Sequence, residues 1–203
     1  MHTDNGSIQL YVITHKEMKL PRSEILIPIR SDRNDGDNIS DKEDYCELRA
    51  QYWIWKNISN VEYIGFFHYR RYLKLGLYNN NKLRTVKPYT IKWKPNIKGY
   101  QKKLIGELIY KYDLIAPVAE EIGESVWEHY DKSAGHSKED LIAVYQIVKK
   151  KYPQYLSAAD YYLSGTKEYF GNIYIMRGEI FRDYCKWVFD ILSEFDNINE
   201  NKL

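Results

Sequence analysis

The stretch "VEYIGFFHYRRYL", residues 61–73, decides the fold, because it joins a buried strand to a charged end. Its first seven residues are apolar, aromatic or β-branched around one glutamate, which predicts a buried strand over 61–67. The tetrapeptide "HYRR" (68–71) follows directly. If the extended conformation continues, His68 and Arg70 point to one side of the strand, and Tyr69 and Arg71 point to the other. The sequence therefore predicts imidazole and guanidinium groups at the carboxyl end of a core strand.

Strands and helices alternate on either side of this stretch. Runs rich in β-branched and aromatic residues predict further strands at 8–16, 112–117 and 168–176. Apolar residues at helical spacing predict helices at about 44–57, 97–111, 124–132, 138–151 and 178–195. This alternation predicts a single α/β domain with a mainly parallel sheet flanked by helices. Ligands of such sheets bind beyond the carboxyl ends of the strands.

The helix before the decisive strand is predicted to be largely buried. Ser40, followed three positions later by Glu43, matches a capping box and predicts that the helix begins there. Apolar residues occupy two separate arcs of the helix 44–57, and Glu47 lies on a narrow strip between them. A carboxylate buried in this way needs a partner, because an unpaired buried charge is costly.

Composition limits the partners of the protein. The chain has 203 residues, with 30 Lys and Arg against 28 Asp and Glu, so its formal net charge is +2. This balance gives no general case for nucleic acid as a partner, and any anion site must be local. Cys46 and Cys185 fit neither a disulfide framework nor a metal motif, and we interpret both as small buried residues in a reducing compartment.

The sequence shows no signal peptide and no apolar run of the ~20 residues that a membrane span requires. We therefore expect a cytoplasmic protein without a transmembrane segment. Peripheral association with the inner face of the membrane stays open.

The arginine pair is the strongest candidate for a binding site. The chain contains neither of the common glycine-rich phosphate loops and none of the common hydrolase motifs. Guanidinium groups suit phosphate because they offer paired donors and keep their charge. The alternative is that Arg70 and Arg71 form ion pairs with Glu47 and Asp37 and brace the preceding loop. Both interpretations stay open at the level of sequence.

Three segments in order, "GDNIS" (36–40), "YCELRAQYWIWKN" (45–57) and "YIGFFHYRRYL" (63–73), carry a resemblance to a known family. They resemble the bacterial family with an HYRR motif that is called domain of unknown function 4422 and is associated with capsular and O-antigen polysaccharide synthesis. Weaker similarity continues through "YDLIAP", "KYPQYL", "GNIYIM" and "DYCKWVFDIL". The resemblance implies a glycosyltransferase with a GT-A-like, Rossmann-like fold that binds a nucleotide sugar.

The resemblance also implies a set of site residues. The catalytic residues implied are Arg70, Arg71, His68 and Asp37. The substrate-binding residues implied are Thr14, His15, Lys16, Asp37, Asn38, Glu47, Tyr69 and Asn172. In this arrangement the residues after the first strand line the nucleotide pocket, the loop residues bond ribose or sugar hydroxyls, and Glu47 orients the arginines. The general base is not identified, and the alternatives are Asp37, His129, His136 and Asp140.

GT-A folds generally hold a metal with an Asp-x-Asp motif at a central strand end, where this chain carries "HYRR". We therefore predict that no cofactor is needed, with Mn²⁺ or Mg²⁺ left open. Two guanidinium groups would offset the charge on a departing nucleoside diphosphate.

These observations lead to one predicted function and one alternative. We expect residues 1–203 to form one glycosyltransferase-like domain with a polar tail at 196–203 and with a nucleoside-diphosphate sugar, preferably a UDP-sugar, as donor. The expected acceptor is a surface polysaccharide or a lipid-linked glycan. The alternative is a non-catalytic nucleotide-sugar or glycan-binding scaffold. Members of the resembled family continue into a further Arg- and Gly-containing segment. The resemblance therefore leaves open that this chain is a shortened version of the enzyme that is inactive or depends on a partner.

Overall fold

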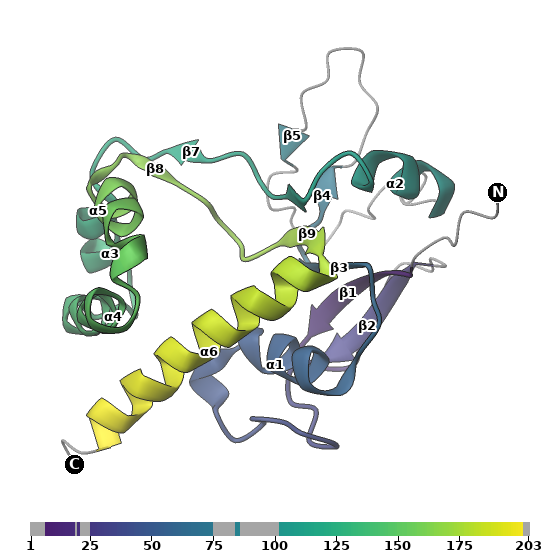
Figure 1. Ribbon diagram of the computed structural model, residues 1–203, viewed down its shortest axis with the longest axis horizontal. Helices are drawn as coiled ribbons and strands as arrows, with labels where there is room; N and C mark the ends of the chain where they lie inside the picture. The colour runs from purple at the N-terminus through teal and green to yellow at the C-terminus, as the bar shows by residue number, and fades with distance from the viewer. Residues whose placement is uncertain (1–6, 19, 21–24, 75–83, 86–101, 201–203) are drawn as a thin grey trace. The chain divides into compact units, whose positions relative to one another are not determined.

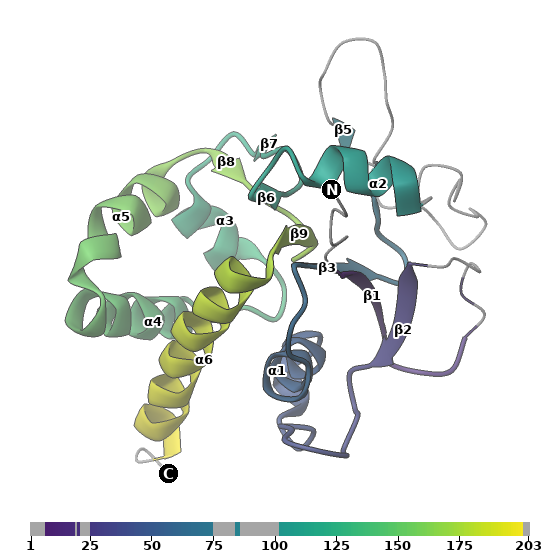
Figure 2. The same cartoon turned by 45° about the vertical axis from the view of Figure 1, so that its right-hand side comes forward.

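The computed structural model describes residues 7–18, 20, 25–74, 84–85 and 102–200 (Figures 1 and 2). Contacts within the chain divide it into two compact units. Unit 1 comprises residues 1–118 and 171–185, and unit 2 comprises residues 119–170 and 186–203. Each unit is described by itself.

Unit 1 is built around a five-stranded sheet with the strand order β2-β1-β3-β9-β6. Its strands are β1 (Ile8–Thr14), β2 (Leu26–Arg30), β3 (Tyr63–His68), β6 (Leu114–Ile115) and β9 (Tyr174–Arg177). Strand β1 pairs in parallel with β2 and β3, whereas β9 runs antiparallel to both β3 and β6. Only β9 therefore opposes the common direction, and the predicted mainly parallel α/β sheet is confirmed.

Helices cover both faces of this sheet (Figure 1). On one face Phe66 of β3 packs against Phe181, in the first part of α6 (Gly178–Glu200), with ring centroids 5.3 Å apart. Gln51 of α1 (Leu48–Asn57) bonds to the β9 side chain Tyr174 on the same face. On the other face Ile109, the last residue of α2 (Lys102–Ile109), joins the buried core. Alternating residues of β3 thus feed two apolar layers, as a sheet buried on both faces requires.

The predicted start of the helix before β3 is wrong. Residues 43–45 form a short 3-10 helix without a side-chain cap, and α1 begins only at Leu48. The backbone of Cys46 lies in the left-handed region, with φ of 47°, and this breaks the helical path between the two elements. Ser40 instead offers its backbone carbonyl oxygen to Arg49 Nη1, 2.9 Å away. Cys46 is exposed rather than buried, whereas Cys185 is buried as predicted.

The predicted strand over 168–176 is also divided. Short strand β8 (Lys167–Glu168) ends before β9 begins, and both Gly171 (φ 96°) and Asn172 (φ 43°) between them have left-handed backbones. A strand cannot continue through two such residues. The predicted strand over 112–117 is reduced to β6, and residues 97–101 of the predicted helix before it lie outside the described residues.

Two further strands complete the described part of unit 1. Strands β4 (Leu73–Lys74) and β5 (Arg84–Thr85) form a two-stranded antiparallel ribbon.

Unit 2 is mainly helical (Figure 2). It contains β7 (Glu120–Glu121), α3 (Val126–Lys132), α4 (Lys138–Lys151), a 3-10 helix (Pro153–Tyr155) and α5 (Leu156–Ser164). Strand β7 pairs with β8, and Ile147 and Val148 of α4 pack with Ile191 of α6. The predictions of α3 and α4 are confirmed, whereas α5 was not predicted. None of the described helices combines the length and apolar character needed to cross a membrane.

Candidate functional site

The HYRR turn, residues 68–71, lies at the carboxyl end of β3. The backbone N–H of His68 donates to the carbonyl oxygen of Arg71 at 3.2 Å, and the N–H of Arg71 donates back to His68 at 2.9 Å. These two bonds close a tight reversal directly after the strand. The expectation that extended backbone places alternate side chains on opposite sides is therefore wrong, because the strand ends at His68.

The HYRR turn meets the carboxyl end of β1. Ile13 of β1 lies opposite His68 in the parallel ladder, and its carbonyl oxygen accepts from the N–H of Tyr69 at 3.2 Å. The ring of His15 lies 5.2 Å from that of Tyr69, measured between centroids. The structure thus brings the predicted residue His15 together with the HYRR turn, as the parallel pairing of β1 and β3 requires.

Thr14 and Lys16 flank this contact in different ways. Thr14 is buried, and its hydroxyl lies 3.4 Å from the carbonyl oxygen of Ile29, so it ties β1 to the end of β2. Lys16 is exposed just beyond the strand. The Lys16 ammonium group therefore adds positive charge near the carboxyl end of β1, whereas Thr14 stabilises the pairing of β1 with β2.

Both guanidinium groups of the HYRR turn are exposed to solvent. The Arg70 guanidinium carbon lies 5.0 Å from the centroid of the Tyr69 ring, which is within the range of a cation–π contact. Arg71 passes close to Gly171, where an added Cβ would lie 3.4 Å from both Cδ and Nη1 of the arginine. Within the described ranges, neither arginine forms an ion pair, so the predicted bracing by Glu47 and Asp37 is not found.

His68 is held neutral by its surroundings. The pKa of His68 is lowered to about 4, chiefly by burial of the ring and then by the positive charges of Arg70 and Arg71, with His15 adding a smaller effect. Its Nδ1 atom lies 3.4 Å from the backbone N–H of Arg70. At neutral pH the imidazole therefore serves as a hydrogen-bonding group and is a weak base, whereas the adjacent arginines keep their charge.

Asp37 and Asn38 belong to a separate set of contacts. The backbone N–H of Asp37 donates to Asn57 Oδ1 at 3.1 Å, and the hydroxyl of Tyr52 donates to the Asp37 carboxylate at 3.2 Å. The Asn38 amide donates to backbone oxygens of its own loop, including that of Gly36 at 2.9 Å. These bonds fasten the loop to α1, and none of the described contacts joins either residue to the HYRR turn.

Glu47 and Asn172 are two further residues of the predicted site, and the structure places them differently. Glu47 is partly exposed and precedes the first residue of α1, so the prediction of a deeply buried carboxylate is wrong. The reason is the late start of the helix, which leaves Glu47 at its end rather than within it. Asn172 is exposed and directly follows Gly171. Asn172 is therefore the neighbour in sequence of the glycine beside Arg71. Glu47 has no such link to the HYRR turn.

Gly171 is the site residue that sequence reasoning missed. Its backbone lies in the left-handed region, with φ of 96°, which favours glycine, and the Arg71 side chain lies beside it. A Gly-Asn pair inside a strand pattern is a signal for a bulge or a turn. That signal was present in "YFGNIYIM" and would have separated the two strands.

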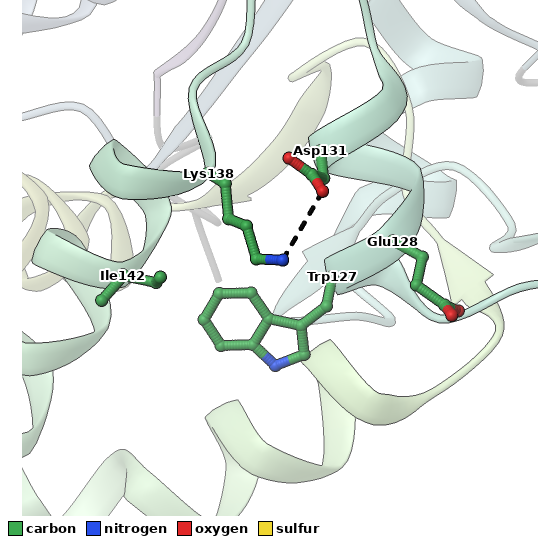
Figure 3. A pocket seen from close by; sticks show the side chains of 5 residues that line it. All are labelled: Trp127, Glu128, Asp131, Lys138 and Ile142. Atoms are coloured by element: carbon green, nitrogen blue, oxygen red, sulfur yellow. Dashed lines mark ion pairs between the residues drawn. The ribbon is translucent and has the colours of Figure 1, made fainter.

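Unit 2 contains a pocket of ≈ 370 Å³ between α3 and α4 (Figure 3). The indole of Trp127 forms part of its wall, and Lys138 reaches toward Asp131, with 3.6 Å between Nζ and Oδ2. The carboxylate of Glu128, also at the pocket, is engaged in a capping box with Ser125. The pocket therefore offers an aromatic wall whose neighbouring charges are already paired.

Comparison with known proteins defines the class of this fold. The solved structure described as WbbM bifunctional glycosyltransferase in its apo form is similar, with a TM-score of 0.83 and 27% sequence identity. The similarity covers 94% of this chain and 37% of the WbbM chain. The fold is thus that of part of a glycosyltransferase structure, and this chain spans little more than a third of that protein.

The family is shown by a second comparison. The family described as domain of unknown function (DUF4422) matches residues 9–202, so the chain belongs to this family. No curated protein matches the chain. The predicted family is confirmed, whereas the role of the HYRR turn and the shortened form stay predictions.

Metal binding is the remaining question about the site. Among the described residues there is no group of three or more His, Cys, Asp or Glu side chains that could hold a metal ion. The predicted independence from metal stays a prediction, since GT-A-like reactions can also draw on ligands from the substrate.

Proposed function

We propose that this protein is a glycosyltransferase that binds the diphosphate of a nucleoside-diphosphate sugar at the HYRR turn. Membership of the DUF4422 family and similarity to the WbbM glycosyltransferase structure support a transferase of this kind. The position of the HYRR turn, at the carboxyl ends of two parallel strands, supports a ligand site in an α/β sheet. The donor we propose is a UDP-sugar, and the acceptor is a surface polysaccharide or a lipid-linked glycan.

One observation carries this proposal. Arg70 and Arg71 are both exposed and, within the described residues, lack an ion-pair partner, while the imidazole beside them is neutral. An anion bound near both guanidinium groups would offset the repulsion between their positive charges. A diphosphate fits this need, because its oxygens accept paired hydrogen bonds from planar guanidinium groups.

In the proposed reaction the positive charges of Arg70 and Arg71 lie beside the leaving diphosphate. An acceptor hydroxyl oxygen forms a bond to the anomeric carbon of the donor sugar, and the bond from that carbon to the diphosphate oxygen breaks. The electron pair leaves with the nucleoside diphosphate, and the hydroxyl proton passes to a general base. The candidates for that base are Asp37, His129, His136 and Asp140. Guanidinium groups fixed before the reaction stabilise the charge that develops on the leaving group.

Calorimetric titration with UDP tests the binding half of the proposal. Replacing both Arg70 and Arg71 with alanine removes two charge-assisted contacts of about 1.5–3 kcal/mol each, so the affinity falls by about 100-fold or more. Arg177→Ala is the matched control, since this partly exposed arginine of unit 1 pairs with Asp113 at 2.6 Å. Equal affinity in the double variant and the wild type would exclude the HYRR turn as the diphosphate site.

Further measurements separate a transferase from other uses of the same site. Titrations with Mn²⁺ and again with EDTA test independence from metal, which the proposal expects. Release of UDP from a UDP-sugar only in the presence of a glycan acceptor supports transfer. Release without acceptor identifies a hydrolase, and binding without turnover identifies a non-catalytic scaffold.

A further inference from the structure

Unit 2 exposes large aromatic side chains that lie close together. Tyr169 is 58% exposed, Phe170 is 39% exposed and Tyr162 is 36% exposed. The rings of Tyr162 and Tyr169 are stacked, with 6.4 Å between centroids and 23° between planes. The backbone of Tyr169 also bonds to the hydroxyl of Tyr162. Grouped aromatic rings left in contact with water are a mark of binding surfaces.

A carboxylate and an imidazole lie within the same group. His129 Nδ1 lies 2.7 Å from Glu168 Oε2, and the His129 ring meets the Phe170 ring edge to face, with 6.0 Å between centroids. Glu168 Oε2 is shielded from solvent and otherwise lacks a hydrogen-bond partner among the described residues. The oxygen is therefore satisfied only when Nδ1 carries a proton, and this contact fixes the direction of the carboxylate.

The Tyr162–Tyr169 pair and the contacts of His129 with Glu168 and Phe170 are joined through the consecutive residues 168–170 of unit 2. We call this group the aromatic cluster, and it consists of His129, Tyr162, Glu168, Tyr169 and Phe170. In helix α3, residue 129 lies about 200° around the axis from Trp127, so the cluster and the pocket of Figure 3 are on different sides of that helix.

The chemistry of the aromatic cluster matches a sugar ring. A pyranose presents apolar C–H groups on its faces and hydroxyl groups around its edge. Exposed aromatic faces pack against the former, while a carboxylate accepts hydrogen bonds from two neighbouring hydroxyls. A nucleoside diphosphate fits poorly, because the cluster contains the negative charge of Glu168 and no arginine or lysine.

We infer that the aromatic cluster is the sugar-binding subsite for the acceptor glycan. This inference rests on the proposed function, since a transferase needs a second site that recognises sugar rather than diphosphate. Tyr169 and Phe170 stack on the sugar, Oε1 of Glu168 accepts hydrogen bonds from its hydroxyls, and His129 positions Glu168 through Oε2.

Saturation-transfer NMR on the full chain tests the inference without any nucleotide. The probes are the methyl glycosides of galactose, glucose and mannose at millimolar concentration. Saturation is expected to pass to the C–H protons of at least one glycoside, and affinity is expected to fall about 10-fold in Tyr169→Ala and in Glu168→Gln. Tyr161→Ala is the matched control, since Tyr161 is 85% exposed on the same helix as Tyr162 and has no ring contact with the cluster in the described structure. This control is expected to bind as the wild type does.

Three results would overturn the inference. One is the absence of saturation transfer to all three glycosides. A second is an equal loss of affinity in Tyr161→Ala and Tyr169→Ala, which would show a general surface effect. A third is a loss in Trp127→Phe with no change in Tyr169→Ala, which would place the sugar in the pocket between α3 and α4.

Titration of the same variants with UDP separates this inference from the proposed function. Tyr169→Ala is expected to keep the UDP affinity of the wild type. If UDP binds and no glycoside does, only the acceptor subsite fails. If a glycoside binds at the cluster and UDP does not bind, the proposed donor site fails while the sugar-binding surface stands.

Discussion

Replacing Arg70 and Arg71 with alanine is expected to raise the pKa of His68. The structure lowers that pKa from the ordinary 6.5 to about 4, and burial is the largest cause, followed by the two arginines. Each single substitution should therefore raise the pKa in part, and the double substitution should raise it further. The value should still stay below 6.5 in the double variant, because burial of the ring remains.

The magnitude of this effect follows from the shift itself. A change from 6.5 to about 4 corresponds to about 3 kcal/mol of difference between the two protonation states. His68 is only half-buried, and solvent screening reduces its contribution to stability to about 1 kcal/mol. Because the folded-state pKa is the lower one, the unfolded chain binds the proton more readily. This stability is complete above pH 6.5 and is lost as the pH falls toward 4.

Histidine-selective NMR titration measures the pKa directly. The chain contains five histidines, and the signal that disappears in His68→Gln identifies the ring. Urea unfolding at pH 7 and pH 5 supplies the second readout, and the wild type should lose about 0.5 kcal/mol more stability than His68→Gln over that interval, roughly half of the full contribution. A wild-type pKa near 6.5 that both arginine substitutions leave unchanged would refute the electrostatic description of the site.

Three further predictions concern the rest of unit 1. Glu47→Ala is expected to change the free energy of unfolding by less than about 0.5 kcal/mol in urea titrations, because its side chain is partly exposed and has no described ion pair; a loss of several kcal/mol would show that it is buried after all. Tyr174→Phe should cost about 1–3 kcal/mol by the same assay, since it removes the donor 2.8 Å from the buried Gln51 oxygen, and an unchanged midpoint would mean that water replaces it. Gly178→Ala should cost about 2–3 kcal/mol, because the new Cβ would lie 2.0 Å from the Val61 carbonyl oxygen; wild-type stability would show that the start of α6 shifts freely.

The sequence predicted the elements whose pattern repeats over many residues. Helix α6 shows apolar residues at three- and four-residue spacing from Phe181 onward, and the structure forms it from Gly178 to Glu200. Strands β1 and β3 are continuous apolar runs that only a covered sheet can bury. The parallel pairing of these two strands was enough to predict that His15 and His68 end at one edge.

Features that depend on one or two residues were missed. Strand β2 contains Pro28, which removes a backbone donor and is tolerated because β2 lies at the edge of the sheet. The HYRR turn contains no glycine, proline or asparagine, so only the backbone bonds between His68 and Arg71 reveal it. The left-handed backbone of Cys46 has no marker in the sequence either, and it moved the start of α1 past Glu47.

Distances between loops lay beyond any local pattern. The family resemblance placed Asp37 in one site with the arginines. In the structure its carboxylate instead accepts from Tyr52 on α1, a contact between residues 15 positions apart. Such contacts are set by how the loop packs on the helix, which periodicity does not record.

The most direct test of the central claim compares UDP with uridine as ligands for the wild type and for the Arg70→Ala/Arg71→Ala double variant. Calorimetry measures the UDP affinities, and ligand-observed NMR measures the weaker uridine affinities. If the HYRR turn holds the diphosphate, the double substitution weakens UDP by about 100-fold or more and leaves uridine within about twofold of the wild type. An equal loss for both ligands, or no loss for UDP, would contradict the assignment of the diphosphate to this turn.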